Sequence, residues 1–436
     1  MNTPIFNQGY VSPLHLACEA GDLQSVVFLL RNNADIHLRD QRQCTPLHLA
    51  SREGHLEVAT LLLRNGADVD AEADRRWTPL HMASWRGHLQ MAYHLIGHMA
   101  DVNAKTEDHA TPLHLASQKG FVNLATLLLR KSADVNAETI KKATPLHLAS
   151  LYGHLDLAKL LLDSSANVNA KTDKQATPLH LASGHCHLDV AKLLVEHGAV
   201  VNAKGCDQLT PLHLASLLGH LQLVILLLQN DAEVDAREQR RGSPLHLASW
   251  RGHLQVAIVL LGSAADVNAK ADRQWTPLHV ASYHGYLQVA NLLTEHEADV
   301  NAKTEEYATP LHMASQNGHL DLAALLLRRS ADVNARTFKQ ATPLHLASLY
   351  GHLGLAKLLL DTSADVNAKT DMQATPLHFA SFHGNFEMAS LLIAYHADVT
   401  SKTNRQATPF DLASARGHHS LANFLRHKAS VSGKSD

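Results

Sequence analysis

Residues 45–51 read Thr-Pro-Leu-His-Leu-Ala-Ser, and versions of this stretch recur along the whole chain. They begin at residues 12, 45, 78, 111, 144, 177, 210, 243, 276, 309, 342, 375 and 408, always 33 residues apart. Thirteen of the fourteen prolines occupy the second position of the stretch. A fixed period of this length indicates an array of structural repeats. The sequence therefore predicts thirteen copies of one unit in strict register.

Each copy carries the signals for a helix start and a helix end. The Thr or Ser is a good N-cap, because its hydroxyl can accept an otherwise unpaired helix N–H, and the proline after it has no N–H to lose. Nine residues after the Thr or Ser, twelve copies carry glycine, which ends helices in the left-handed conformation. A second helix follows, as in residues 56–64, and it is apolar on most sides, which is typical of a helix buried between neighbours.

An Ala-Asp-Val-Asn-Ala segment, such as residues 100–104, and a short polar loop then lead to the next Thr. Helix, tight turn, helix and polar hairpin within 33 residues, with Thr-Pro-Leu-His at the front, resemble the ankyrin repeat. The resemblance covers nearly the whole chain. It implies an all-α solenoid of helix-turn-helix units with β-hairpin-like finger loops, stacked into a curved, elongated array.

The end copies differ from the internal ones. Cys18 and Asp22 replace the usual Ser and His in the first copy, and Phe410 and Asp411 replace Leu and His in the last. Atypical end units with a polar outer face cap repeat arrays. We therefore expect one ankyrin-repeat domain over residues 1–427, followed by a disordered tail. Its parts are an N-terminal capping repeat (1–38), internal repeats (39–402), a C-terminal capping repeat (403–427) and the tail (428–436).

Composition narrows the class of partner and the compartment. The formal net charge is −3, whereas a general nucleic-acid binder shows a basic face. The four cysteines show no metal or disulfide spacing, which suits a reducing compartment. The N-terminus has no signal-peptide pattern, and the apolar runs are too short to span a bilayer. We expect a monomeric cytoplasmic protein, with the nucleus as the alternative location. We expect it not to bind nucleic acid and not to insert into a membrane.

The chain carries no motif of a known catalytic site, so we expect neither an enzyme nor a cofactor. Phosphate-binding loops, GxGxxG, GxSxG and HExxH are all absent. Histidine is abundant, with 33 residues, but 12 are the fourth residue of the repeated stretch and nine follow the turn glycine position. Equivalent residues of adjacent units lie about 8–10 Å apart, too far apart to share one ion. We expect structural histidines and no metal site.

Asparagine recurs in the Asp-Val-Asn-Ala segment or its variants, where its side chain can stabilise a turn. The resemblance also implies a modification, because intracellular dioxygenases hydroxylate such asparagines in ankyrin arrays. The candidate positions are Asn103, Asn136, Asn169, Asn202, Asn268, Asn301, Asn334 and Asn367.

The positions that vary between copies are the ones that inform about function. One variable phase lies seven and eight residues after the Thr and, in the ankyrin family, lines the concave groove; the other lies at the finger tips. Aromatic residues and arginine dominate binding hot spots. The candidate partner-binding residues are Trp85, Arg86, Tyr152, Trp250, Arg251, Tyr283, Tyr307, Phe338, Tyr350 and Phe382. The alternative is that these rings only pack along the groove wall and stiffen the stack.

A longer repeat lies on top of the short one, because residues 305–378 nearly repeat residues 107–180. We infer the duplication of a six-unit block, which gives two related surfaces. The function expected from these features is a non-enzymatic protein-interaction scaffold or adaptor. The alternative is a host-directed effector or inhibitory regulator that masks a target enzyme.

Overall fold

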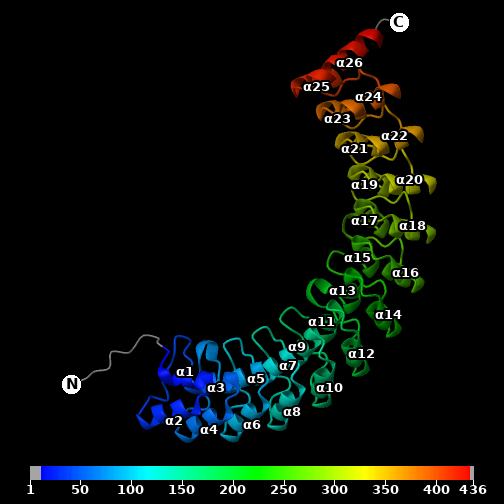
Figure 1. Cartoon of the computed structure of the whole chain (residues 1–436). Coiled ribbons are helices and arrows are strands. Elements are labelled where there is room, and N and C mark those ends of the chain that lie inside the picture. Colours follow the sequence, from blue (N-terminus) through cyan, green and yellow to red (C-terminus); the bar gives the residue numbers. More distant parts are fainter. Residues whose placement is uncertain (1–10, 433–436) are drawn as a thin grey trace. The chain divides into compact units, whose positions relative to one another are not determined.

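The computed structural model describes residues 11–432, and their contacts divide the chain into two compact units, residues 1–211 and 212–436. The described part is all-helical, with 26 α-helices and no strand. In each unit the first helices of the copies form one row and the second helices another (Figure 1). We call these the inner and outer helices. The predicted all-α repeat fold is confirmed.

The helices of the first unit have nearly constant lengths. Its inner helices are α1 (Pro13–Ala20), α3 (Pro46–Glu53), α5 (Pro79–Arg86), α7 (Pro112–Lys119), α9 (Pro145–Tyr152) and α11 (Pro178–Gly184). Its outer helices are α2 (Leu23–Arg31), α4 (Leu56–Arg64), α6 (Leu89–Gly97), α8 (Val122–Arg130), α10 (Leu155–Asp163) and α12 (Leu188–Glu196).

The second unit repeats this pattern. Its first helix, α13, starts on Pro211, which is the last residue of the first unit. The inner helices are α13 (Pro211–Leu218), α15 (Pro244–Arg251), α17 (Pro277–His284), α19 (Pro310–Asn317), α21 (Pro343–Tyr350), α23 (Pro376–Phe382) and α25 (Pro409–Ala415). The outer helices are α14 (Leu221–Gln229), α16 (Leu254–Gly262), α18 (Leu287–Glu295), α20 (Leu320–Arg328), α22 (Leu353–Asp361), α24 (Phe386–Ala394) and α26 (His419–Ser432).

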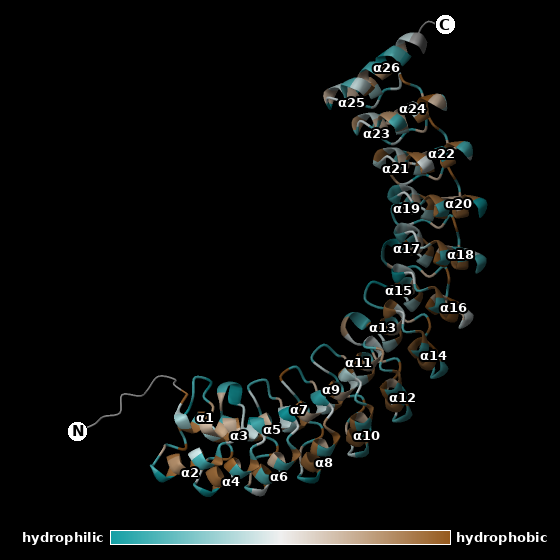
Figure 2. Ribbon diagram, in the orientation of Figure 1, coloured by the Kyte–Doolittle hydropathy of each residue, from teal (hydrophilic) through white to brown (hydrophobic). Residues whose placement is uncertain are grey.

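The core lies between the two rows and is built from the same positions in each copy. In α19, Leu311 and Ala314 have no solvent exposure, and in α20 Leu322, Ala323 and Leu326 are equally buried. Spacings of one, three and four residues place such side chains on one stripe of a helix. Alanine at a contact lets two helices approach closely, whereas the leucines fill the space between copies. Figure 2 shows the hydrophobic residues concentrated in the helices and the finger loops largely hydrophilic.

The turn glycines have a second role that the sequence did not reveal. They adopt the expected left-handed backbone, with φ between 72° and 84°. In addition, at ten of these twelve glycines a ring from the next copy packs where a Cβ atom would stand. A Cβ atom on Gly318 would lie 2.6 Å from Nδ1 of His352. Glycine therefore suits the turn both for its backbone conformation and for close packing between neighbouring copies, although Cys186 adopts the same left-handed turn in one copy.

The finger loops are turns and contain no β-strand in the part of the chain that the structure describes. In the finger before α19, the Thr304 N–H donates to the Ala308 carbonyl (2.9 Å), and the Thr304 hydroxyl accepts from the Ala308 N–H (3.1 Å). Three tips form a 3₁₀ turn: η1 (Asp74–Arg76), η2 (Cys206–Gln208) and η3 (Asp272–Gln274). The described finger loops therefore resemble β-hairpins in the hydrogen bonds of their turns, but they contain no paired strands.

The C-terminal end differs from the expectation of a tail beginning at residue 428. Helix α26 has 14 residues and continues to Ser432, so residues 428–432 are helical. An outer helix of the internal copies ends after nine residues. The rest of the expected tail, residues 433–436, lies outside the described residues, as does most of the short segment before the first copy.

Replacing Gly318 with Ala should destabilise the protein more than replacing Gly417 with Ala. Both glycines have φ of 77°, but nothing lies within 4 Å of a Cβ atom on Gly417. The left-handed backbone costs about 1–2 kcal/mol in either variant. Gly318→Ala must also displace the His352 ring, whose hydrogen bond contributes about 1 kcal/mol. Thermal unfolding followed by circular dichroism measures the difference, and equal melting temperatures would contradict the packing role of the glycine.

Ser348→Ala should stabilise the protein. The Ser348 hydroxyl is fully buried on α21 and has no hydrogen-bond partner among the described residues, and burying an unpaired hydroxyl costs about 1–3 kcal/mol. Ser414 occupies the same position in the last copy but is exposed. We expect Ser348→Ala to raise the melting temperature and Ser414→Ala to leave it unchanged. A lower melting temperature for Ser348→Ala would show that the hydroxyl has a stabilising contact.

Candidate functional site

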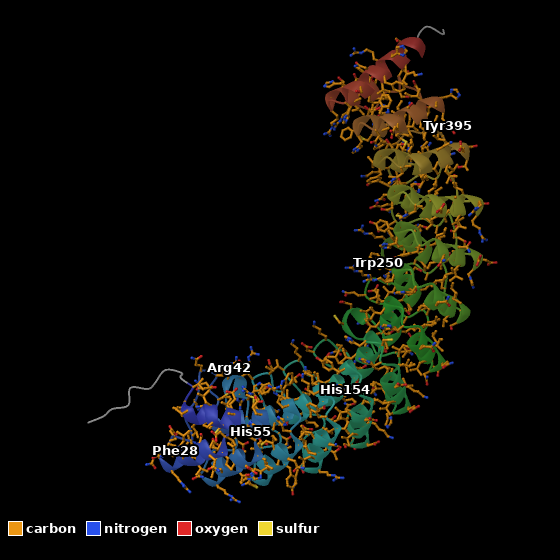
Figure 3. All side chains as sticks on the ribbon, in the orientation of Figure 1. Phe28, Arg42, His55, His154, Trp250 and Tyr395 are labelled. Carbon is orange, nitrogen blue, oxygen red and sulfur yellow. The ribbon has the colours of Figure 1, made fainter. Side chains whose placement is uncertain are left out.

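Three of the predicted aromatic residues stand open at the ends of inner helices. Tyr152 on α9 is 46% exposed, Trp250 on α15 is 47% exposed and Tyr350 on α21 is 52% exposed. Trp250 lies on the inner-helix side of the second unit (Figure 3). Each ring is held on one side, as in the hydrogen bond from Gln118 Nε2 to Tyr152 Oη (3.2 Å). These rings therefore present a fixed, partly apolar face to the solvent.

The other predicted inner-helix rings are half-buried. The Trp85 ring meets Trp77 edge-on, with centroids 6.1 Å apart, and the Lys119 ammonium lies 3.8 Å from its centroid. The Arg416 guanidinium covers Phe382 in the same way, 4.0 Å from the ring centroid. For these two residues the alternative interpretation, packing along the wall, accounts for a large part of the ring surface.

An aromatic cluster surrounds Trp250 in the second unit. The His284 ring meets Trp250 edge-on, with centroids 4.6 Å apart, and lies 5.1 Å from the Tyr283 ring. Tyr283 in turn packs against Trp275, with centroids 5.8 Å apart. Burial lowers the pKa of His284 from its ordinary value, so this imidazole is neutral at pH 7. The cluster holds Trp250 by ring contacts while leaving half of it open.

The predicted charged and finger-tip residues are all exposed. Arg86 and Arg251 close the last turn of α5 and α15. Tyr307 and Phe338 lie on neighbouring fingers, and their rings stack with centroids 6.4 Å apart and an interplanar angle of 12°. The structure thus brings Trp250 and Arg251 together on α15 and Tyr307 and Phe338 together at two adjacent tips.

The histidines of the repeated stretch tie each finger to the helix that follows it and to the next copy. In α21, the Thr342 N–H and hydroxyl donate to Nδ1 of His345, at 3.1 and 2.8 Å. Because Nδ1 accepts, the proton of the neutral ring is on Nε2, which donates to the Ala374 carbonyl at 3.1 Å. This arrangement differs from the simple N-cap that the sequence predicts, since the shortest contact of the hydroxyl is to the imidazole. We call it the histidine clamp.

The clamp recurs through both units. It is formed in the copies that begin at Thr45, Thr78, Thr111, Thr144, Thr177, Ser243, Thr276, Thr309, Thr342 and Thr375. Burial in the clamp lowers the pKa of these imidazoles. The pKa falls to about 4 for His48, His81, His114, His147, His246, His279, His312 and His345.

The second set of histidines faces the opposite way along the stack. His352 Nε2 donates to the Gln316 carbonyl of the preceding copy at 3.0 Å, and His55 and His154, labelled in Figure 3, make the equivalent contact at 3.0 and 3.1 Å. Both sets of histidines thus form hydrogen bonds that join neighbouring copies. Over residues 11–432 no three His, Cys, Asp or Glu side chains come together as metal ligands.

The asparagines of the Asp-Val-Asn-Ala segment also connect neighbouring copies, so their role is larger than that of a local turn residue. Asn301 Oδ1 accepts from the Asp332 N–H at 2.8 Å, and its Nδ2 donates to the Ser330 carbonyl at 3.2 Å. The same pair of bonds is formed by Asn103, Asn136, Asn169, Asn268, Asn334 and Asn367. Asn202 is the eighth candidate position, and hydroxylation of these residues stays a prediction.

One exposed residue escaped the sequence analysis. Met372 stands at the tip of the finger that follows the Phe338 finger and is exposed. It was missed because methionine is not among the residue types that dominate hot spots. A position-by-position comparison of residues 305–378 with residues 107–180 could have found it, since Lys174 is its counterpart.

Comparison with known families now identifies the class of the protein. The model of ankyrin repeats, taken three copies at a time, matches residues 14–106, 94–172, 113–205, 167–238, 201–271, 232–304, 278–370 and 364–435. The chain therefore belongs to the ankyrin-repeat family, whose repeats form a protein-protein interaction module. A comparison with curated proteins returns no match. No helix of the described part is long and apolar enough to cross a membrane.

Acid should destabilise the protein steeply between pH 6.5 and pH 4. The pKa of eight clamp histidines is about 4 in the folded state, against about 6.5 when unfolded. The unfolded chain then binds more protons in this window, so stability falls as the pH falls. Each neutral histidine adds to this loss of stability, which begins near pH 6.5 and is complete near pH 4. Melting temperatures at pH 7.5, 6.5, 5.5 and 4.5 measure the effect; a constant melting temperature would contradict the neutral clamp.

Proposed function

We propose that this protein is a non-enzymatic interaction scaffold that binds a protein partner through the ends of its inner helices and its finger tips. The observation that carries the proposal is the exposure of Tyr152, Trp250 and Tyr350 at one phase of the repeat. Trp and Tyr supply large, rigid contact areas and are the residues that dominate interface energetics. A chain with few aromatic residues, 5% of the total, has these three at a phase of the repeat that varies from copy to copy.

The framework supports this choice of surface, because it leaves these positions free to vary between copies. The clamp histidines and the second histidines each bond through Nε2 to a neighbouring copy, and the asparagines bond to the next copy through both Oδ1 and Nδ2. These side chains therefore serve the stack. The last turn of each inner helix has no such constraint, since it points away from the core and varies from copy to copy. Selection for a partner can act there without loss of stability.

The surface has the mixed character of a protein interface rather than that of a uniform polyanion site. Arg86 and Arg251 follow Trp85 and Trp250 directly along the chain. Arginine beside an aromatic anchor is a common hot-spot pair. The fingers carry charges of both signs, and alternating charges select a partner by complementarity.

The triple variant Tyr152→Ala, Trp250→Ala and Tyr350→Ala tests the proposal. We expect it to lose the proteins that the wild-type chain captures from a native lysate, because the exposed aromatic contacts are gone. Loss of one hot-spot residue typically weakens binding by about 2 kcal/mol. The captured proteins are identified and quantified by mass spectrometry.

The matched control carries Phe28→Ala, Tyr93→Ala and Ile258→Ala. These residues are also exposed and apolar but lie on outer helices. The control should keep every partner that the wild type captures, and both variants should keep the helical circular dichroism spectrum. Equal capture by the wild type and the inner-helix variant would reject the proposed surface.

A further inference from the structure

Three consecutive fingers of the second unit present large apolar side chains at their tips. Tyr307, Phe338 and Met372 are 50%, 72% and 49% exposed. We call these three residues the tip strip. Tyr307 and Phe338 stack on each other, and backbone hydrogen bonds join the fingers, from Phe338 N–H to the Glu306 carbonyl (2.8 Å) and from Asp371 N–H to the Lys339 carbonyl (3.1 Å). The strip is therefore a fixed, continuous surface and not three independent loops.

The duplicated block provides an internal comparison for the tip strip. Residues 107–180 share the Thr-Pro-Leu-His framework with residues 305–378, and the two blocks have the same finger lengths. The counterparts of Tyr307, Phe338 and Met372 are His109, Ile140 and Lys174. The framework has no need for apolar residues of this size at the tips, because the first block folds in the same way without the ring of Tyr307 or the methionine.

A row of positive charges runs beside the tip strip. Four consecutive fingers carry one exposed cation each, directly before the threonine that closes the finger turn: Lys303, Arg336, Lys369 and Lys402. Arg336 Nη1 donates to the Lys369 carbonyl at 3.2 Å, so this side chain lies along the row. In the first block, Glu138 takes the place of Arg336. This negative charge interrupts the row of cations there. Cations also occupy this position at Lys171, Lys204, Arg237 and Lys270, so the row extends beyond the second block. The second block is distinguished by an unbroken row beside three apolar tip residues, whereas the first has Glu138 in the row and Ile140 as its one apolar counterpart.

We propose that the tip strip and the basic row form a docking surface for an acidic protein segment that carries aromatic or aliphatic side chains. The apolar residues of the segment would pack on Tyr307, Phe338 and Met372, and its carboxylates would lie against the cations of the row. The exposed carboxylates Glu305, Glu306 and Asp371 stand among the tips, so the carboxylates of the segment would have to lie over the row and its apolar side chains over the tip strip. This inference rests on the proposed protein-binding function and names the partner class for one part of the surface.

A random peptide library displayed on phage, panned on the full chain, tests the inference. We expect the enriched peptides to combine Asp or Glu with Phe, Trp or Leu. Synthetic fluorescein-labelled copies of these peptides are then titrated by anisotropy. The tip variant, Tyr307→His, Phe338→Ile and Met372→Lys, installs the residues of the first block and should weaken binding at least about tenfold. Since Met372→Lys adds a positive charge, this loss cannot come from a weaker attraction for an acidic peptide.

A second variant tests the basic row. Arg336→Glu also installs the first-block residue, and we expect it to weaken binding about three- to tenfold at low salt and less at high salt, because salt screens exposed charges. The matched control replaces Leu320, Asp321 and Ala324 on outer helix α20 with their first-block counterparts Val, Asn and Thr. Like the tip variant, this control carries three substitutions taken from the first block. It should bind the peptides as the wild type does.

Several results would overturn the inference. They are enrichment of neutral or basic peptides, failure of any peptide to be enriched, and binding of a 30-nucleotide poly-dT strand that the tip variant loses. Peptide binding that survives in the tip variant but is lost with Tyr152→Ala, Trp250→Ala and Tyr350→Ala would also exclude the tip strip, while leaving the proposed function intact. The proposed function itself is rejected only if the wild type and the inner-helix variant capture the same proteins from the lysate. The two failures are therefore distinguishable.

Discussion

The neutral imidazole of the clamp is the group on which the stack depends. It accepts from the threonine N–H and hydroxyl with Nδ1 and donates from Nε2 to the carbonyl that lies 29 residues further along the chain, as in His345. One side chain thus fixes the start of a helix and the position of the next finger. Protonation of Nδ1 would turn this acceptor into a donor and break the bond from the threonine N–H, and burial of the imidazoles keeps them neutral.

The last copy shows what the clamp requires at the end of an array. Asp411 stands in place of the histidine, and its Oδ2 accepts from the Thr408 N–H and hydroxyl at 2.9 and 2.7 Å. Asp411 therefore accepts the same two bonds from the threonine that a clamp histidine accepts with Nδ1. A carboxylate accepts but cannot donate, so the replacement keeps the bonds within the copy and lacks the Nε2 donor of the clamp.

Most of the fold could be predicted from the sequence, because its signals are local. Proline after Thr or Ser and glycine nine residues later set the helix limits, as the bounds of α19 show. What could not be predicted depends on the neighbouring copy: the packing of the His352 ring on Gly318 and the bonds from Asn301 to the next copy. The exposure of candidate rings also depends on neighbours, which is why Trp85 is half-covered by Lys119 and Trp250 stays open.

The duplicated block separates folding from recognition more directly than the short repeat does. Two segments with one framework keep the clamp and the asparagine bonds, as at His147 and His345, so these positions serve the stack. The finger tips differ in kind, with Lys174 in one block and Met372 in the other. A large apolar side chain in water gains nothing for the folded state unless it is covered. The docking surface proposed above would give Met372 the cover that it lacks in the free chain.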